Sequence, residues 1–344
     1  MTFDPPRCAN PGCAQHEQPK PGFCIRHGYY RPHCRTEPIQ RFRCRTCGKT
    51  FSRQTFRHDW RDRRYDRNDR LFELLASGVG LRQSARLLGL GLRSVQKKMR
   101  KLATTCALLH ENLSPRLPER RTYVMDEEET YEGASIRPLT MPVLIDKQTW
   151  FVVATSVGSI RRLAPAGTAR RARQEHDERQ HGRRKDESSE CVREVLEALR
   201  RRIDGELELR TDEKASYATI ARQVFDERVL HTTTAGTALR TTHNPLFPIN
   251  TTLAMTRDNC GRLRRRSWLV SKKAGWLRRQ MAIFTVYRNY VRRRFNRDER
   301  RETPAVHLGL LPRQLLPSEV VRWRQDWGPR SPHPTSFRGE RSVA

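Results

Sequence analysis

Two stretches of the chain share a pattern of apolar and polar positions that gives way to an acidic residue. In TYVMDEEET the apolar run stops at Asp126, and in ELELRTDEKASY the residues Leu207 and Leu209 alternate with polar ones before Asp212. Alternation with a period of two predicts half-buried β-strands, so we expect each strand to end at its aspartate. Two aspartates at neighbouring strand ends can hold a divalent metal ion between them.

The residues around these stretches predict the rest of an α/β domain. The run MPVLIDKQTWFVVATSVG predicts a second strand that ends at Ile145 and a third through Thr155. Residues 161–190 carry almost no large apolar side chains, which predicts a mobile charged loop. The segment SSECVREVLEALRRRI has helical spacing, and a helix over 215–224 and a short strand over 228–230 follow Asp212. The predicted order is β-β-β-α-β-α-β.

Helical spacing dominates an earlier stretch, LFELLASGVGLRQSARLLGLGLRSVQKKMRKLA. Its apolar residues are interrupted by pairs of glycines, which predicts three short helices, the last with Ser94 as its N-cap. Three short helices with a basic last one match a helix-turn-helix, whose second helix lies in the major groove of DNA. An ordinary helical packing unit with a solvated basic face is the alternative. The residues expected to face DNA are Arg93, Gln96, Lys97 and Arg100.

A strongly basic segment follows the α/β pattern. It predicts a turn around Pro245 and Pro248 and then a long basic helix, and no acidic residue lies between Arg262 and Arg297. We expect the arginines of this segment to bind DNA phosphates and not to take part in chemistry. Those named for this role are Arg257, Arg264, Arg265 and Arg266.

The first part of the chain contains two closely spaced pairs of cysteines, in CANPGC and RFRCRTCGKTF. Two such pairs predict a tetrahedral zinc site in a zinc ribbon. The zinc is expected to be structural, because a segment this short buries too little surface to fold without it. Cys24, His27, His33 and Cys34 lie between the pairs and offer a second site, but their irregular spacing favours a loop. The expected zinc ligands are Cys8, Cys13, Cys44 and Cys47.

The net charge of the chain indicates which class of partner it binds. The 344 residues include 68 Lys plus Arg against 38 Asp plus Glu, which gives a net charge of +30 and a pI near 10.9. A field of this size attracts polyanions and gives salt-dependent binding through counterion release. No apolar run approaches the roughly 20 residues of a membrane helix, and no secretory segment follows Met1. We therefore expect an intracellular protein that binds nucleic acid and no membrane.

These patterns divide the chain into four parts, and the expected fold class is multidomain. The parts are a zinc ribbon over 1–52, a linker and all-α helix-turn-helix over 53–113, an α/β domain over 114–300 that includes the loop over 161–190, and a C-terminal tail over 301–344. The tail has short helical patches before a Pro- and Arg-rich end that we expect to be disordered.

The order of these parts resembles that of DDE-type insertion-sequence transposases. The resemblance is carried by RFRCRTCGKTFS, the helix-turn-helix, MDEEET, TDEKASY, and a third block that begins at Asn250 and ends in RSWLVSK. It implies a ribonuclease H-like catalytic domain that cleaves and joins DNA strands with two divalent ions, Mg²⁺ or Mn²⁺. The implied partners are double-stranded DNA, as terminal inverted repeats and target DNA, and further copies of the chain in a homodimer or larger assembly. The implied location is the nucleoid in a bacterial or archaeal cytoplasm.

The resemblance matches Asp126 and Asp212 to the first two catalytic positions but finds no glutamate at the third. Asn250 stands there, and its amide oxygen can bind Mg²⁺ but carries no charge, so the metal would be held more weakly. Asp258, eight residues later, is rotated by about 80° on a helix and is the rival. The missing glutamate keeps a second hypothesis open, a sequence-specific DNA-binding regulator whose ribonuclease H-like domain is inactive.

Overall fold

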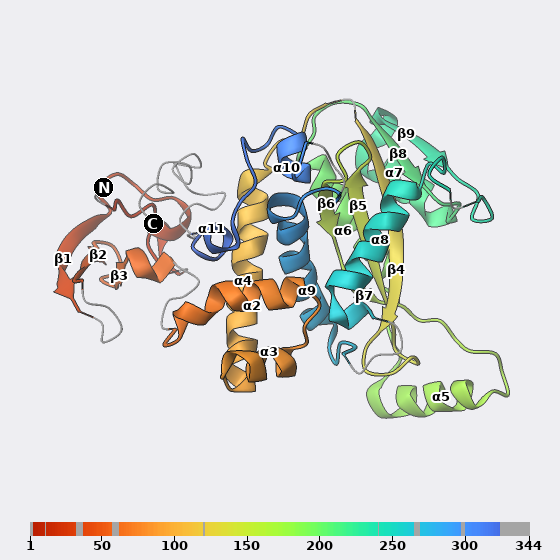
Figure 1. The fold of residues 1–344 in the computed structure, drawn as a ribbon, viewed down its shortest axis with the longest axis horizontal. Helices are drawn as coiled ribbons and strands as arrows, with labels where there is room; N and C mark the ends of the chain where they lie inside the picture. Colours follow the sequence, from red (N-terminus) through yellow and green to blue (C-terminus); the bar gives the residue numbers. More distant parts are fainter. Residues whose placement is uncertain are drawn as a thin grey trace.

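The fold is given by a computed structural model that describes residues 3–10, 12–31, 37–56, 62–119, 121–239, 241–264, 269–296 and 300–323. In Figure 1 a small sheet of the first strands lies at one end of the molecule, helices α4 and α9 lie in the middle, and a larger sheet lies beyond them. Predictions that involve His33, Cys34, Arg265, Arg266 or the chain after Trp323 fall outside the described residues. No described helix is both long and apolar enough to cross a membrane.

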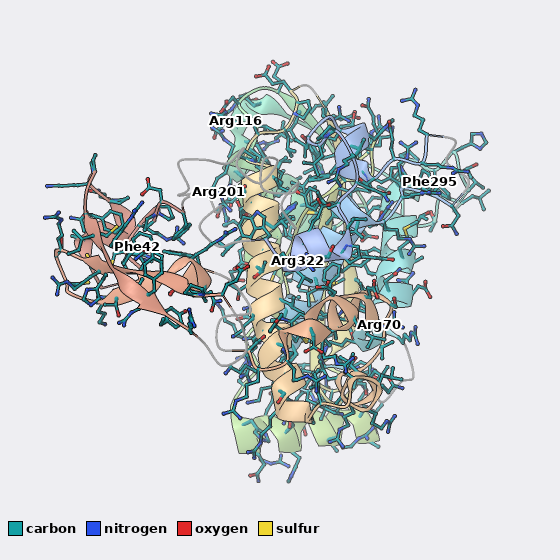
Figure 2. All side chains as sticks on the ribbon, turned by 60° about the vertical axis from the view of Figure 1, so that its left-hand side comes forward. Phe42, Arg70, Arg116, Arg201, Phe295 and Arg322 are labelled. Carbon is teal, nitrogen blue, oxygen red and sulfur yellow. The ribbon has the colours of Figure 1, made fainter. Side chains whose placement is uncertain are left out.

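The N-terminal part forms a small antiparallel sheet around an aromatic core. Its elements are α1 (Ala14–Glu17), β1 (Cys24–Tyr30), β2 (Ile39–Cys44), β3 (Thr50–Ser52) and the turn η1 (Arg53–Phe56), with strand order β1-β2-β3. The core consists of Phe23, Phe42, Phe51 and Phe56 beside buried cysteines, and Figure 2 shows Phe42 within this sheet. Because the core is so small, burial alone gives this part little stability.

Helices make up the next part of the chain: η2 (Tyr65–Arg67), α2 (Asn68–Ala76), α3 (Leu81–Leu88) and α4 (Leu92–Leu113). The predicted N-cap at Ser94 is wrong. Helix α4 begins at Leu92 because Gly91 has an extended backbone and acts as the N-cap, and its carbonyl accepts the Ser94 N–H at 3.0 Å. Helix α4 is also longer than expected and packs along α9 (Ala274–Val286).

One core joins these helices to the larger sheet. It contains Leu75 of α2 and Met99 and Leu109 of α4 together with Leu144 and Phe151 of the α/β part. The core therefore crosses the boundary expected between residues 113 and 114, and α4 is a structural part of both regions.

The α/β part is built on a mixed sheet in the order β6-β5-β4-β8-β9, with β7 paired to β5. Strand β4 is antiparallel to β5 and parallel to β8, β5 is antiparallel to β6, and β8 is parallel to β9. The strands are β4 (Thr122–Tyr131), β5 (Pro138–Asp146), β6 (Val152–Thr155), β7 (Gly158–Ser159), β8 (Leu207–Thr211) and β9 (Val229–Thr233). The predicted meander of three strands is present, with β7 in addition.

The expectation that the first strand stops at Asp126 is wrong. Strand β4 continues to Tyr131, because every residue after Asp126 has a partner on β5, and the last is Pro138 opposite Tyr131. Near Asp126 only the pairing of β4 with β8 ends, and its last pair is Val124 and Arg210. Asp126 therefore lies inside a strand, at the level where a neighbouring strand ends.

The sheet is covered on both faces by α6 (Ser188–Arg200), α7 (Ala215–Phe225) with the turn η3 (Asp226–Arg228), and α8 (Phe247–Asn259). Helices α6 and α7 share the main core with Tyr123 and Met125 of β4. Helix α8 shares a second core with Val124. Since alternate residues of a strand point to opposite faces, Asp126 lies on the same face as Val124, beneath α8.

The expectation of a loop over 161–190 is wrong, because α5 (Ala169–His181) occupies much of it. In Figure 1 this helix projects from the body of the molecule. Its only buried residue is Gln174, but ion pairs of Arg137 with Asp177 and of Arg161 with Glu178 attach it to the sheet region. Good helix formers, an N-cap at Thr168 and these ion pairs replace apolar burial.

The single long basic helix expected after Pro248 is also wrong. Helix α8 ends at Asn259, and the turn η4 (Gly261–Leu263), α9 and the π-helical turn η5 (Tyr287–Val291) follow. The break lets Gly261 approach the α2–α3 turn so closely that a Cβ there would lie 2.4 Å from the carbonyl oxygen of Gly78. The chain then forms α10 (Pro304–His307) and α11 (Pro317–Val321) and buries Trp323 in the main core.

Candidate metal centres

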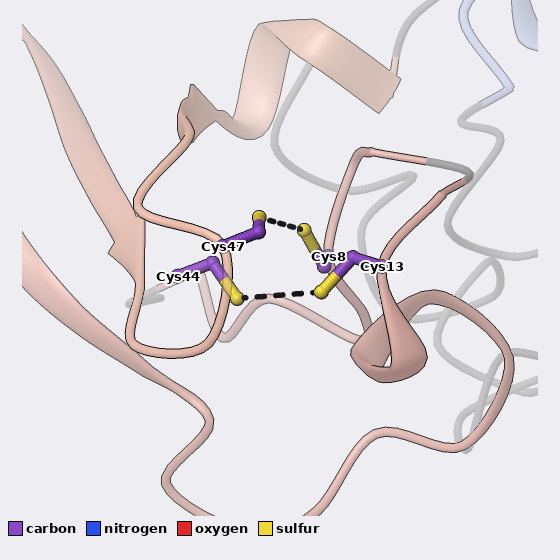
Figure 3. A group of neighbouring side chains, drawn as sticks. All are labelled: Cys8, Cys13, Cys44 and Cys47. Carbon is purple, nitrogen blue, oxygen red and sulfur yellow. Dashed lines mark hydrogen bonds between the residues drawn. The ribbon is translucent and has the colours of Figure 1, made fainter.

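Four cysteine side chains converge in the N-terminal part. Cys8 Sγ lies 3.6 Å from Cys47 Sγ, and Cys13 Sγ lies 3.8 Å from Cys44 Sγ. All four sulfurs are within 4.8 Å of one another, and Figure 3 shows the two pairs facing each other from separate loops. None of the four forms a disulfide. We call this group the cysteine cluster.

The local sequence explains how each pair is held. Gly48, at φ 68°, turns the chain so that its N–H reaches the Cys44 carbonyl at 3.0 Å, a backbone conformation that glycine adopts without strain. On the other loop the Asn10 N–H points to Cys8 Sγ at 3.4 Å. The backbone N–H of Lys49 lowers the pKa of the Cys47 thiol to about 7, whereas burial raises the pKa of the Cys8 thiol.

The cluster fits a metal ion such as zinc. A tetrahedral zinc ion with Zn–S bonds of about 2.3 Å separates its sulfurs by about 3.8 Å, which is close to the two measured separations of 3.6 and 3.8 Å. Cys24 and His27 do not join it: Cys24 lies opposite Cys44 on β1 and His27 is exposed. Among the described residues, the cysteine cluster is the only group of three or more His, Cys, Asp or Glu side chains close enough together to hold one metal ion.

The second candidate metal centre lies at the C-terminal end of β8. Thr122 pairs with Glu208 and Val124 with Arg210, and the same offset aligns Asp126 with Asp212, one residue beyond the end of β8. The Asp126 carboxylate accepts the Glu127 N–H at 2.7 Å, and Asp212 accepts the Lys214 N–H at 3.1 Å at the start of α7. Asp212 therefore also shapes the turn that begins a helix.

Electrostatics connect these two aspartates. Burial raises the pKa of Asp126 to about 6, and the charges of Asp212, Glu127 and Glu128 add to the effect. Three of these acids also act on Tyr217 of α7, whose pKa is raised mainly by burial and further by Glu127, Asp212 and Asp126. Four carboxyl groups so close together repel one another, and we call them the acidic site.

Two cations partly neutralise this acidic site. Lys214 pairs with Glu127 and lies over the ring of Tyr217, with Nζ 5.3 Å from the ring centroid. Arg257 of α8 pairs with the buried Glu128. Sequence reasoning missed Lys214 and Tyr217, although both stand within five residues of Asp212 and could have been noticed there.

The direction of α8 sets the position of Asn250. At its start Phe247 packs against Trp150 at 6.0 Å, beside the β5 end that pairs with the start of β4. Near its end Arg257 pairs with Glu128, so α8 runs in the same direction as β4, as Figure 1 shows. Asn250 lies about 10 Å before Arg257 on nearly the same side of the helix, which puts it level with the part of β4 that holds Asp126.

The rival position, Asp258, points elsewhere. It is exposed, and it follows the buried Ile249 by nine residues, a rotation of about 180° on a helix. It therefore lies on the side of α8 opposite the sheet. Its carbonyl oxygen accepts a hydrogen bond from the side chain of Arg264 at 3.2 Å.

The residues expected to face DNA lie on one side of α4. Arg93, Lys97 and Arg100 are exposed and Gln96 is half-buried, whereas Val95 and Met99 are buried in the core. Arg264 is also exposed. Arg257 differs from the expectation, because it is half-buried and bound to Glu128 and is not exposed as a phosphate contact.

Comparison with known proteins found no match: no family model matches the chain, and no curated protein matches it.

Proposed function

We propose that this protein is a DDE-type transposase that binds the terminal inverted repeats of an insertion sequence and performs metal-dependent cleavage and transfer of DNA strands. The observation that supports this most is the parallel register of β4 and β8, whose last pair is Val124 and Arg210, because two further residues on each chain segment bring Asp126 level with Asp212. Their electrostatic coupling agrees with it, since the charge of Asp212 helps to raise the pKa of Asp126.

The topology supports a ribonuclease H-like assignment for the catalytic part. Three antiparallel strands, a helix, a parallel strand, a helix and a second parallel strand follow one another as in the expected order, with β7 and α5 as additions. We assign the N-terminal sheet with its cysteine cluster as a zinc ribbon, and α2, α3 and α4 as the helix-turn-helix. The net charge of +30 fits a double-stranded DNA partner.

In this proposal Asp126 and Asp212 would hold the catalytic Mg²⁺ or Mn²⁺, with the amide oxygen of Asn250 as a neutral third ligand. A bound divalent ion supplies Lewis acidity for an in-line displacement at a phosphodiester. Lys214 and Arg257 hold Glu127 and Glu128 through ion pairs, which limits the negative charge that would repel a DNA phosphate. Because an insertion sequence has two ends, the proposal includes a homodimer or larger assembly on DNA, in a nucleoid.

The test is a nicking and strand-transfer assay on duplex DNA that carries the repeats flanking the gene. Asp126→Ala and Asp212→Ala should abolish Mg²⁺- or Mn²⁺-dependent products. Glu213→Ala is the matched control, because this neighbouring acid is exposed and has no assigned role. Retention of full activity by both aspartate variants would contradict the proposal.

The second candidate is a sequence-specific DNA-binding regulator with an inactive ribonuclease H-like domain. What favours it is the acidic site itself, where Asn250 stands in place of an acid and two of the carboxylates are already paired with cations. Asn250→Glu separates the two candidates. In a transposase it should strengthen Mn²⁺ binding, measured by calorimetry, and preserve or increase nicking. In a regulator it should leave nicking absent.

A further inference from the structure

Three arginines from different elements surround one tryptophan at the junction of the helical and α/β parts. The guanidinium carbons of Arg100 on α4 and Arg279 on α9 each lie 5.1 Å from the ring centroid of Trp276, and that of Arg262 on η4 lies 5.9 Å away. We call this group the arginine cluster. Its members are brought together only by the fold, since they span the chain from residue 100 to residue 279.

In the part of the chain that the structure describes, the arginine cluster has no acidic partner. Among the described residues, no carboxylate lies within ion-pairing distance of any of the three guanidinium groups. Their hydrogen bonds are few: Arg262 Nη1 is 3.5 Å from Ser271 Oγ, and Arg279 Nη1 donates to the Gly275 carbonyl at 2.8 Å. The ring of Trp276 attracts cations, but it cannot balance three like charges that repel one another.

Burial raises the free-energy cost of the unbalanced positive charge at Arg262. Arg262 is half-buried, and burial lowers the pKa of its guanidinium to about 10. Arg100 is exposed, while Trp276 and Arg279 are half-buried, so the cluster opens to solvent on the α4 side. A cationic site that is partly desolvated, open on one side and not paired with any acid among the described residues has the electrostatic character of an anion-binding site.

The location relates the cluster to the surface expected to face DNA. Arg100 follows Arg93 by seven residues, and this spacing puts both on one side of α4. The η4 turn that carries Arg262 is held against the α2–α3 turn: a Cβ at Gly78 would lie 2.9 Å from the Asp258 carbonyl oxygen, and one at Gly261 would lie 2.4 Å from that of Gly78. The turn that carries Arg262 is therefore fixed against the α2–α3 turn, and Arg100 joins the cluster to α4.

We propose that Arg100, Arg262 and Arg279, arranged around Trp276, bind phosphate groups of the DNA backbone where the helix-turn-helix meets the α/β part. Guanidinium groups suit this role because they donate two parallel hydrogen bonds to phosphate oxygens. That the ligand is DNA rests on the proposed function. In this role Arg100 contacts the backbone and not a base edge, and the cluster sets the path of the duplex toward the acidic site.

The first test uses inorganic phosphate as the probe and thermal unfolding of the full chain as the readout. At about ten times its Kd, phosphate should raise the Tm by about 2 °C more than chloride at equal ionic strength. Arg262→Gln with Arg279→Gln should lose this increment. The matched control is Arg201→Gln with Arg222→Gln, which removes the same charge from two exposed positions, the C-cap of α6 and a residue of α7. An equal increment in both double variants would overturn the proposal.

The second test uses a mixed-sequence duplex and measures affinity against salt concentration. The cluster double variant should bind on the order of tenfold more weakly, and the slope of log K against log salt should fall by about two, since each lost phosphate contact removes about 0.9. Arg100→Gln, at an exposed position that cannot disturb the core, should lower the slope by about one. Slopes equal to that of the Arg201 and Arg222 control would overturn the proposal.

These outcomes are separable from those that test the proposed function. Asp126→Ala should abolish nicking and leave the salt slope unchanged. DNA binding through the arginine cluster without any nicking would refute the transposase and keep the phosphate site. Nicking that coexists with unchanged slopes in the cluster variants would refute the phosphate site alone.

Discussion

The cysteine cluster and the acidic site differ in how completely their donor atoms are assembled. The four sulfurs already stand at separations that suit one tetrahedral ion. In the acidic site, the register of β4 and β8, continued two residues past its last pair, brings Asp126 level with Asp212, while Glu127 and Glu128 form ion pairs with Lys214 and Arg257. The first arrangement suits a permanently bound structural ion, whereas in the proposed function the second would hold ions that bind together with a phosphate substrate.

The two sites also differ in what surrounds them. The cysteine cluster lies in its own small core of phenylalanines, separate from the other cores. Asp126 lies between the main core on one face of β4 and the α8 core on the other. Loss of the metal should therefore unfold the N-terminal part, whereas loss of a carboxylate from the acidic site should not unfold the sheet.

The largest effect is expected from removal of the cysteine cluster's metal. We expect the protein to bind one zinc ion per chain. Cys44→Ser, or chelation with phenanthroline, should remove this ion and unfold the N-terminal part, because zinc binding contributes on the order of 10 kcal/mol to such folds. Metal analysis and limited proteolysis measure both results. A zinc-free N-terminal part that still resists protease would show that its small core suffices.

Asp126→Asn should have an effect of the opposite sign. The pKa of Asp126 is raised from its ordinary 3.8 to about 6, so ionisation costs folding free energy at any pH above the unfolded value. The cost is absent below about pH 4 and complete above about pH 6. Without added divalent ions, the variant should therefore be more stable at pH 8 by about 3 kcal/mol, with no gain at pH 3.5, as measured by urea unfolding. A gain that is equal at both pH values would exclude this origin.

Arg257→Met should have a smaller effect, a loss of folding stability. Arg257 is a partner of the buried Glu128, and a hydrogen bond to a charged group contributes about 2 kcal/mol. If the role of Arg257 is to neutralise Glu128, then Arg257→Met together with Glu128→Gln should recover most of the loss at pH 8. A double variant no more stable than Arg257→Met would mean that the arginine acts through packing alone.

The smallest effect is expected for Cys24→Ser. Cys24 lies directly opposite Cys44 on the neighbouring strand but outside the cysteine cluster. The variant should keep the full zinc content and change the unfolding free energy by less than about 0.5 kcal/mol. Cys44→Ser makes the same chemical change at the paired position and serves as the comparison. Any zinc loss from Cys24→Ser would mean that Cys24 is also a zinc ligand and would contradict this prediction.

Sequence alone was informative wherever the chemistry is local. The spacing of the two cysteine pairs predicted the cysteine cluster, because each pair sits on a short turn whose geometry a few residues determine. The strands around Asp126 and Asp212 followed from alternation, although the end of the first strand was misplaced. Its real length depends on pairing with β5, a partner that the pattern of β4 does not reveal.

Tertiary structure decided the remaining features. Ion pairs to distant arginines hold α5 where composition predicted a loop, and the approach of Gly261 to Gly78 breaks a segment that was expected to be one helix. Packing alone brought Arg257 to the acidic site and assembled three arginines around Trp276. Such contacts join residues far apart along the chain, and their energies depend on burial and distance, which no local pattern of residues encodes.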